Sequence, residues 1–191
     1  MKRTSLTIIG VMVMTVLAFA VGVAFRRGQQ TTFRPFVMYA TLTQYDSKGN
    51  GLWLRNERTA VDREGNVTIM YSFAAGAVSY LYTLAEGGQY LSNGKVTGEL
   101  VGGKHATLRS LPQDAGTLKA AAGFVGMDLV LGLPTFASEM KDPQGASTQW
   151  VSPLTNGLPL KNVVRHGEVT SVVEPSSIEF RDPTPAEMWH P

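Results

Sequence analysis

The 191-residue chain contains no cysteine, so it forms no disulfide, has no cysteine nucleophile and cannot be lipidated at an N-terminal cysteine. Histidine is scarce as well: His105, His166 and His190 lie 61 and 24 positions apart, without the spacing of metal ligands. The G-x-S-x-G motif that presents a catalytic serine is also absent. We therefore expect no metal, no cofactor and no catalytic residue, and a fold that depends on its hydrophobic core.

An excess of one charge is lacking too, once the N-terminus is set aside. The chain has 17 basic and 15 acidic residues, and four of the basic ones, Lys2, Arg3, Arg26 and Arg27, flank a single apolar run. The remaining 13 basic and 15 acidic residues give the rest of the chain a net charge of −2. A mildly acidic surface of mixed sign offers no basic patch for phosphate groups, so we expect no nucleic-acid partner.

Residues 6–25 form the one long hydrophobic run, uncharged and mostly apolar. As a helix rising about 1.5 Å per residue, this run spans the roughly 30 Å core of a bilayer. Residues 1–27 are therefore predicted to be either a membrane anchor or a cleaved signal peptide, for which Ala18 and Ala20 supply a cleavage site. The length of the run and the arginine pair after it favour the anchor. In both cases the rest of the chain lies on the periplasmic or extracytoplasmic side of the cell envelope, tethered to the inner membrane or secreted.

Beyond this segment we expect a polar tether over residues 28–35, one domain over residues 36–181 and a loosely ordered tail over residues 182–191. Runs rich in β-branched and aromatic residues, separated by turn formers, indicate short strands. The predicted strands are residues 36–45, 52–61, 67–73, 77–84, 89–91, 135–140, 147–151, 159–165, 168–173 and 178–180. In the first half the gaps between them are too short for helical crossovers, so these strands pair in antiparallel fashion. The predicted fold class is mainly β with minor α: a curved antiparallel sheet or incomplete barrel with short helices, preceded by the N-terminal hydrophobic helix.

The middle of the domain breaks this pattern. Residues 115–124 are rich in alanine, and their apolar residues have helical spacing. Asp114 is a suitable N-cap, because its carboxylate accepts from the free N–H groups of the first turn. Residues 127–133 are apolar and flanked by glycine. They either continue the helix or form a buried strand, and periodicity does not decide between the two at this length.

Aromatic residues follow one another along the predicted strands. The candidate ligand-binding residues are Tyr39, Trp53, Tyr71, Tyr80 and Tyr82. Such side chains suit a concave apolar surface that receives a lipid or an acyl chain. They suit the ordinary core of a sheet equally well. Aromatic residues on both faces of the first strand favour the ligand surface, because a single core face does not require them.

The C-terminal third carries a series of short motifs. In order they are Trp150-Val-Ser-Pro-Leu154, Leu158-Pro-Leu-Lys161, His166-Gly-Glu168-Val-Thr170, Val173-Glu-Pro-Ser-Ser177 and Phe180 with Pro183. This series resembles the end of exported bacterial proteins found notably in acidobacteria, which are distantly similar to periplasmic lipoprotein carriers of the LolA/LolB type. The resemblance implies a strongly curved, incomplete barrel closed by short helices over an apolar cavity, with a lipid or lipoprotein as partner. The arginine that such carriers use to handle lipoproteins corresponds equally well to Arg55 or Arg58.

Three functions remain open at this level. The first is a non-catalytic envelope module that binds a lipid, an acyl chain or a lipoprotein on a curved sheet. The second is a membrane-tethered interaction or structural module, with a filled interior and an exposed apolar patch. An enzyme is the least favoured, because it needs ionisable groups that converge in one cleft. The candidates for such a cleft are His105, His166, Glu57, Glu168, Asp128 and Glu139.

Overall fold

The computed structural model describes residues 33–73 and 114–188 with a gap at residue 144, residues 108 and 111, and the backbone of three short strands between them. The predicted N-terminal helix, residues 1–27, lies outside the described residues, as does most of the predicted tether. Within the described residues, no helix combines the length and the apolar character needed to cross a membrane.

Eleven strands within the described residues form a single antiparallel sheet. They are β1 (Phe36–Tyr45), β2 (Gly51–Val61), β3 (Val67–Phe73), β4 (Leu81–Thr83), β5 (Tyr90–Ser92), β6 (Thr97–Glu99), β7 (Phe124–Val130), β8 (Leu133–Asp142), β9 (Gly145–Val151), β10 (Pro159–His166) and β11 (Val169–Glu179). One short α-helix in the same residues, α2 (Ala115–Ala120), precedes β7. A 3-10 turn, Pro153–Thr155, links β9 to β10.

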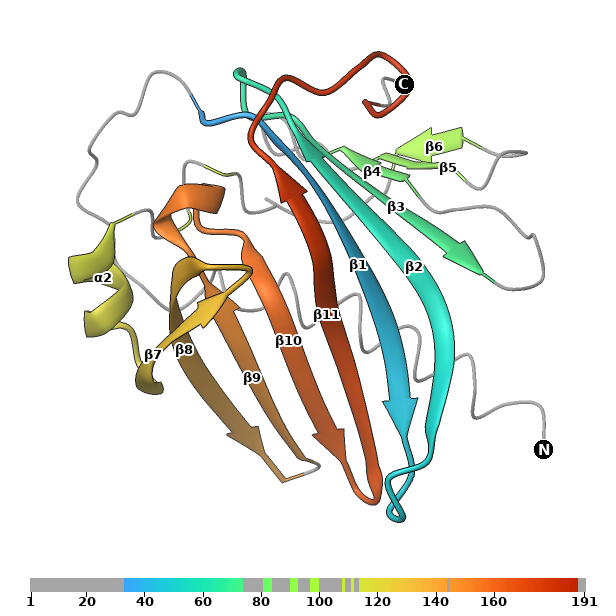
Figure 1. Ribbon diagram of the computed structural model, residues 1–191, viewed down its shortest axis with the longest axis vertical. Coiled ribbons are helices and arrows are strands. Elements are labelled where there is room, and N and C mark those ends of the chain that lie inside the picture. The colour runs from blue at the N-terminus through green and yellow to red at the C-terminus, as the bar shows by residue number, and fades with distance from the viewer. Residues whose placement is uncertain are drawn as a thin grey trace.

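The strand order across the sheet is β6-β5-β4-β3-β2-β1-β11-β10-β9-β8-β7. The chain therefore builds two meanders, β1 to β6 and β7 to β11, which join along the first and last strands (Figure 1). The strands β6 and β7 lie at the two ends of this order, so the sheet is open. The predicted mainly β, antiparallel architecture is confirmed, in the form of one open sheet with a short helix.

The first two hairpins turn on the same five-residue pattern, Asp-x-x-Gly-Asn, at residues 46–50 and 62–66. In both, one oxygen of the aspartate accepts from the backbone N–H groups two and four positions ahead, at 2.8–2.9 Å. The glycine is needed because φ is +81° at Gly49 and +89° at Gly65, a region that side chains with a Cβ disfavour. These turns set the register of β1 with β2 and of β2 with β3.

The segment around α2 differs from the prediction in its boundaries. The Asp114 carboxylate accepts from the backbone N–H of Thr117 at 2.8 Å, which confirms the predicted N-cap. The helix ends at Ala120, earlier than predicted, because the next residue already has an extended backbone. Residues 124–130 form β7 and Leu133 begins β8, so the ambiguous segment does not continue the helix. It belongs to a β-hairpin, and β7 is mostly exposed, so the expected buried strand is wrong in its burial.

The two strands predicted at residues 168–173 and 178–180 are one strand, β11, which runs through Pro175. Proline donates no backbone hydrogen bond, and a strand with neighbours on both sides accepts it mainly at a bulge. The register of β11 with β1 indeed skips Ser176. The hydroxyl of Ser176 donates to the backbone carbonyl of Tyr39 at 3.2 Å. The proline therefore marks an irregularity within β11 and does not end the strand.

The main hydrophobic core gathers on one face of the sheet, called the inner face below. On β1 the buried residues of this face are Phe36, Met38, Ala40 and Leu42, the set that alternation predicts. Phe36 and Met38 pack in the same cluster as Leu160 of β10, at the other side of β11. The inner face is thus where the two meanders share a core.

The opposite face, called the outer face, is covered near one end of β1 and β2 by the C-terminal tail (Figure 1). Met188 packs against Val37 and Ala60 there. Glu187 is only 7% exposed. Residues 182–188, the part of the predicted loose tail that the structure describes, therefore make defined contacts with the sheet.

Candidate ligand-binding site

A pocket lies on the inner face, between strands that are not neighbours in the sheet. Its walls come from β2 and β3 on one side and from β10 on the other, although β1 and β11 separate them in the strand order. The sheet therefore curves around the pocket. The apolar part of the lining consists of Met38, Ile69, Leu158, Pro159, Leu160, Val164 and Val173. The free volume is about 70 Å³.

Arg55 and Glu57 form a buried ion pair in the wall of this pocket. The Nε and Nη2 groups of Arg55 donate to Glu57 Oε1 at 2.9 and 2.7 Å. The two side chains are 6% and 12% exposed. The guanidinium carbon of Arg55 lies 4.0 Å from the centre of the Tyr71 ring, within cation–π distance. The pocket wall thus holds two opposite charges whose sum is zero.

A row of directly paired residues crosses the inner face from β8 to β3. In order it consists of Ser138, Gln149, Asn162, Val173, Leu42, Arg55 and Phe73. Side chains of directly paired residues project from the same face of a sheet. Because Asn162, Val173 and Arg55 line the pocket, Gln149 belongs to the same face, as the cross-strand neighbour of Asn162.

The end of this row on β8 to β10 is polar and buried. The Ser147 hydroxyl donates to Asn162 Oδ1 at 3.2 Å. Gln149 is 2% exposed, and among the described residues its Nε2 has no hydrogen-bond partner. A buried donor without an acceptor costs about 1–3 kcal/mol, so such groups are rare in folded proteins. Among the described residues, Gln149 therefore contributes a buried, unpaired hydrogen-bond donor to the inner face, called the orphan donor below.

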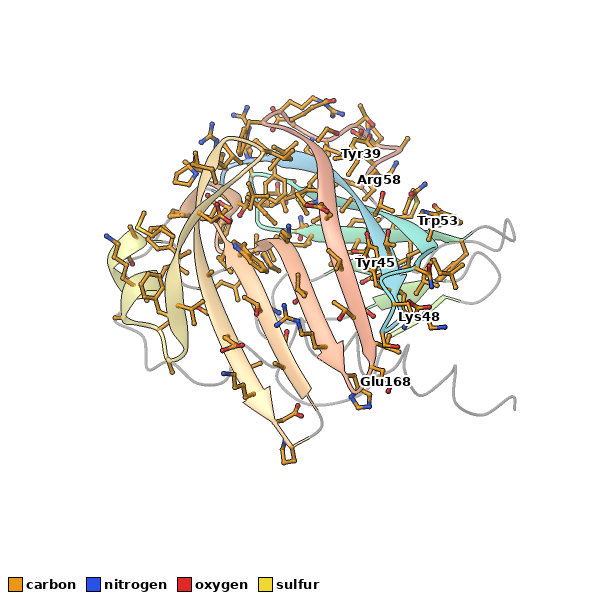
Figure 2. The ribbon with its side chains drawn as sticks, turned by 60° about the horizontal axis from the view of Figure 1, so that its bottom comes forward. Tyr39, Tyr45, Lys48, Trp53, Arg58 and Glu168 are labelled. Carbon is orange, nitrogen blue, oxygen red and sulfur yellow. The ribbon has the colours of Figure 1, made fainter. Side chains whose placement is uncertain are left out.

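The predicted aromatic residues fall on both faces. Tyr71 lines the pocket. Tyr39 and Trp53 lie on the outer face, 36% and 38% exposed (Figure 2). Tyr80 lies outside the described residues, and only the backbone of Tyr82 is described, paired with β3. One of the five is thus placed in the pocket and two are placed away from it.

A bulge in β2 explains why Trp53 and Arg55 lie on opposite faces of the sheet. Two positions apart, these residues share a face in a regular strand, as alternation predicts. In the structure Leu42 pairs with Arg55 and Thr43 pairs with Trp53, so Leu54 is an extra residue. One inserted residue reverses the alternation beyond it. Arg55 therefore points into the pocket and Trp53 to the outer face.

The two arginines that the carrier resemblance left equivalent are on different faces. Arg55 lines the pocket. Arg58 pairs with Tyr39 in the register of β1 and β2, and both are seen together on the outer face in Figure 2. Arg58 Nη2 donates to the backbone carbonyl of Ala186 at 3.0 Å, so this arginine holds the C-terminal tail. Only Arg55 is placed to contact a ligand in the pocket.

Glu57 alone, among the described members of the ionisable set considered for an enzyme, lines the pocket. Asp128 and Glu139 belong to the hairpin of β7 and β8. His166 ends β10, and Glu168 lies in the turn between β10 and β11 (Figure 2). The remaining histidine of the set is outside the described residues. In the described part of the chain, no three side chains of His, Cys, Asp or Glu gather into a group that could hold a metal ion.

No protein-family model and no curated protein matches this chain. Solved structures of low sequence identity do match. A chain of the Pseudomonas aeruginosa MucA/MucB complex is 15% identical with a TM-score of 0.47, and the match covers 93% of this chain but 59% of that one. A LolA-superfamily protein from Nitrosomonas europaea is 11% identical with a TM-score of 0.39, over 90% and 94% of the two chains. The lipoprotein LppX of Mycobacterium tuberculosis is 9% identical with a TM-score of 0.34, over 73% and 84%. Proteins of the predicted carrier type are thus among the matches, at similarities that extend none of their properties to this chain.

Proposed function

We propose that the domain is a non-catalytic binding module of the cell envelope that holds an acyl chain of a lipid or lipoprotein on its inner face. The observation that carries the proposal is the pocket between the two meanders, with aliphatic side chains from β1, β3, β10 and β11 in its lining. An acyl chain gains about 0.8 kcal/mol for each methylene group that such a surface removes from water. The N-terminal hydrophobic run would keep the domain on the extracytoplasmic side of the membrane that supplies this ligand.

The volume of the pocket limits what it holds. About 70 Å³ is far less than the roughly 300–1,000 Å³ of sites that enclose a whole drug-sized ligand. It accommodates a few water molecules or a short piece of a hydrocarbon chain. The pocket therefore receives one end of the ligand, and the rest of an acyl chain would lie along the inner face outside it.

Binding of a fluorescent long-chain acyl ester to the full-length protein, kept soluble in an amphipathic polymer, tests this proposal. We expect saturable binding, and we expect acyl compounds to be recovered by solvent extraction of the protein as isolated. Val164→Phe fills the pocket and should lower the affinity for the probe at least about tenfold, because the phenyl ring occupies the space of several methylene groups. Val163→Phe is the matched control, because Val163 is the next residue on β10 and faces the other way.

Absence of saturable binding by the unmodified protein would contradict the acyl-binding function. Equal binding by the two phenylalanine variants would place the ligand away from this pocket. Urea unfolding of both variants shows whether either substitution has changed the fold itself.

A second function, a protein–protein interaction module, is favoured by a different observation. The edge strand β7 and its turn expose four large apolar side chains in alternation: Val125, Met127, Leu129 and Leu131, with 58%, 57%, 67% and 42% of their surface exposed. We call this the β7 stripe. In the strand order β7 has a neighbour on one side only. Exposed apolar edges of this kind mark interaction sites or aggregation hazards.

The stripe function is tested by a Met127→Ser, Leu129→Ser double variant of the full-length protein. If the stripe is an interaction surface, a photo-crosslinker at Leu129 captures a discrete partner in cells. The double variant should then lose co-purification of that partner, while its binding of the acyl probe is unchanged. A crosslinker at Asp142, at the exposed far end of β8, serves as the control position. Equal capture at both positions would speak against a specific surface.

A further inference from the structure

We infer that the inner face selects a neutral acyl ester, such as a monoacylglycerol, over the anion of a free fatty acid. This inference rests on the proposed acyl-binding function and names its ligand class. Three observations carry it: the internal charge balance of the pocket, the orphan donor of Gln149, and the cross-strand row that places both on one face.

The charges that line the pocket are already neutralised. Among the described lining residues, Arg55 is the cation on the inner face, and Glu57 lies 2.7 Å from it. Lys161 also borders the pocket, but its ammonium group pairs with Glu174 at 2.9 Å on the outer face. A fatty-acid carboxylate entering this site would bring a second negative charge beside Glu57, with no unpaired cation for it among the described lining residues. Burial of an unpaired charge is strongly unfavourable, whereas a neutral head group carries no charge to bury.

The polar end of the row provides what a neutral head needs. An ester has a carbonyl oxygen that accepts hydrogen bonds and no hydrogen to donate through that group. Gln149 Nε2 is a buried donor without an acceptor among the described residues, and Gln149 pairs directly with Asn162, which lines the pocket. An ester carbonyl at this position removes the cost of that unpaired donor.

The size of the pocket agrees with a small head. A free volume of about 70 Å³ accommodates a few heavy atoms, such as an ester group with its adjoining carbons. The aliphatic lining on the side of Met38, Ile69 and Val173 then meets the first part of the chain. The site is thus polar where the head lies and apolar where the chain begins.

The inference is tested by competition on the full-length protein, with a fluorescent acyl methyl ester as the probe at pH 8, where oleic acid is ionised. We expect monooleoylglycerol to displace the probe at a concentration at least about tenfold lower than oleate, both being used below their critical micelle concentrations.

Two substitutions with opposite expected effects identify the groups. Glu57→Gln leaves Arg55 without its counter-charge and should raise the affinity for oleate at least about tenfold, with little change for monooleoylglycerol. Gln149→Met removes the orphan donor, so it should lower the affinity for the ester about tenfold. The free energy of unfolding without ligand should stay equal or rise. Thr148→Val, on the opposite face of β9, is the control for Gln149→Met.

A structural role alone for Gln149 would lower stability and affinity together, which contradicts the inference. Oleate that competes as well as monooleoylglycerol, or a Glu57→Gln variant with unchanged oleate affinity, also overturns it. In these cases acyl binding as such would stand, whereas failure of every acyl compound to displace or bind would contradict the proposed function itself.

Discussion

The guanidinium of Arg55 donates through Nε and Nη2 to a single oxygen of Glu57, at 2.9 and 2.7 Å, in the wall of a pocket where both side chains are almost fully buried. Removal of one member leaves the other charge buried without its partner, which lowers the free energy of unfolding by about 3–5 kcal/mol for buried pairs. Replacement of both by apolar residues of similar size is far less costly.

For the ion pair we therefore predict that Arg55→Met destabilises the domain by about 3 kcal/mol and that Arg55→Met with Glu57→Leu restores most of this loss. Urea unfolding of the wild type, both single variants and the double variant measures the coupling free energy. Additive single effects would show that the two side chains do not act as a pair.

The C-terminal tail is held by Glu187, which accepts from both Nη groups of Arg181, at 2.7 and 2.8 Å, and from the backbone N–H of Thr184. The hydrogen bonds from Arg181, followed by those from Thr184, lower the pKa of Glu187 from its ordinary value of 4.5, against the opposing effect of burial. The folded state thus prefers the ionised carboxylate. Its contribution to stability is fully present above about pH 4.5 and is lost as the pH falls below that value toward the lowered pKa.

Glu187→Gln should therefore cost about 1–2 kcal/mol near neutral pH, because Arg181 loses a charged acceptor but stays partly solvated. The difference between variant and wild type should shrink as the pH falls from 5 to 3, which urea unfolding over that range measures. A constant difference across the range would contradict the stated role of the carboxylate.

Substitution by alanine should lower stability by very different amounts at two glycines with similar φ angles. Gly132, with φ +74°, faces open space, so Gly132→Ala costs about 1–2 kcal/mol for the left-handed backbone alone. At Gly123, with φ +80°, a Cβ would also run into the backbone carbonyl oxygen of Glu139. Gly123→Ala should therefore cost clearly more, and it should disturb the junction between α2 and β7. Thermal unfolding of both variants compares them, and equal costs would argue against the close approach.

The two Asp-x-x-Gly-Asn turns should differ in their importance. The turn with Asp62 packs against the start of the domain, where the ring of Phe33 covers Gly65 and the Phe33 N–H donates to the carbonyl of Arg63 at 3.1 Å. The turn with Asp46 is fully exposed. We predict that Asp62→Ala costs about 1–2 kcal/mol of unfolding free energy and that Asp46→Ala costs clearly less. Chemical unfolding checks the order, and the reverse order would show that the contact with Phe33 contributes little.

The strands of the domain follow closely from local pattern. The predicted strands at residues 36–45 and 67–73 have the observed bounds, because alternation and turn chemistry act over a few residues and need no knowledge of distant partners. Local pattern does not decide the segment 127–133, because it is short, apolar and flanked by glycine, and its pairing depends on β8 as a partner. Gly123, with its positive φ, lies in the turn between the end of the helix and the start of β7.

The residues of the candidate site follow less closely from the sequence than the strands do. An aromatic pattern pointed to Tyr39 and Trp53, which lie on the outer face, and to Tyr71, which lines the pocket. The bulge at Leu54 decides which side of β2 each residue faces, and no signal in the sequence marks it. A single polar residue at an inward position, such as Gln149, looks like any surface residue until the pairing of its strand is known.

By itself the sequence determined the local properties of this protein: the hydrophobic run of residues 6–25, the mildly acidic remainder without cysteine, and most of the strands and turns, because each depends on neighbours in the chain. The tertiary structure alone decided that β1 pairs with β11, that the sheet curves around a pocket, and that Arg55 and Gln149 share one row across it. Those relationships join residues about a hundred positions apart, and they depend on register and on bulges. Local composition carries no record of either.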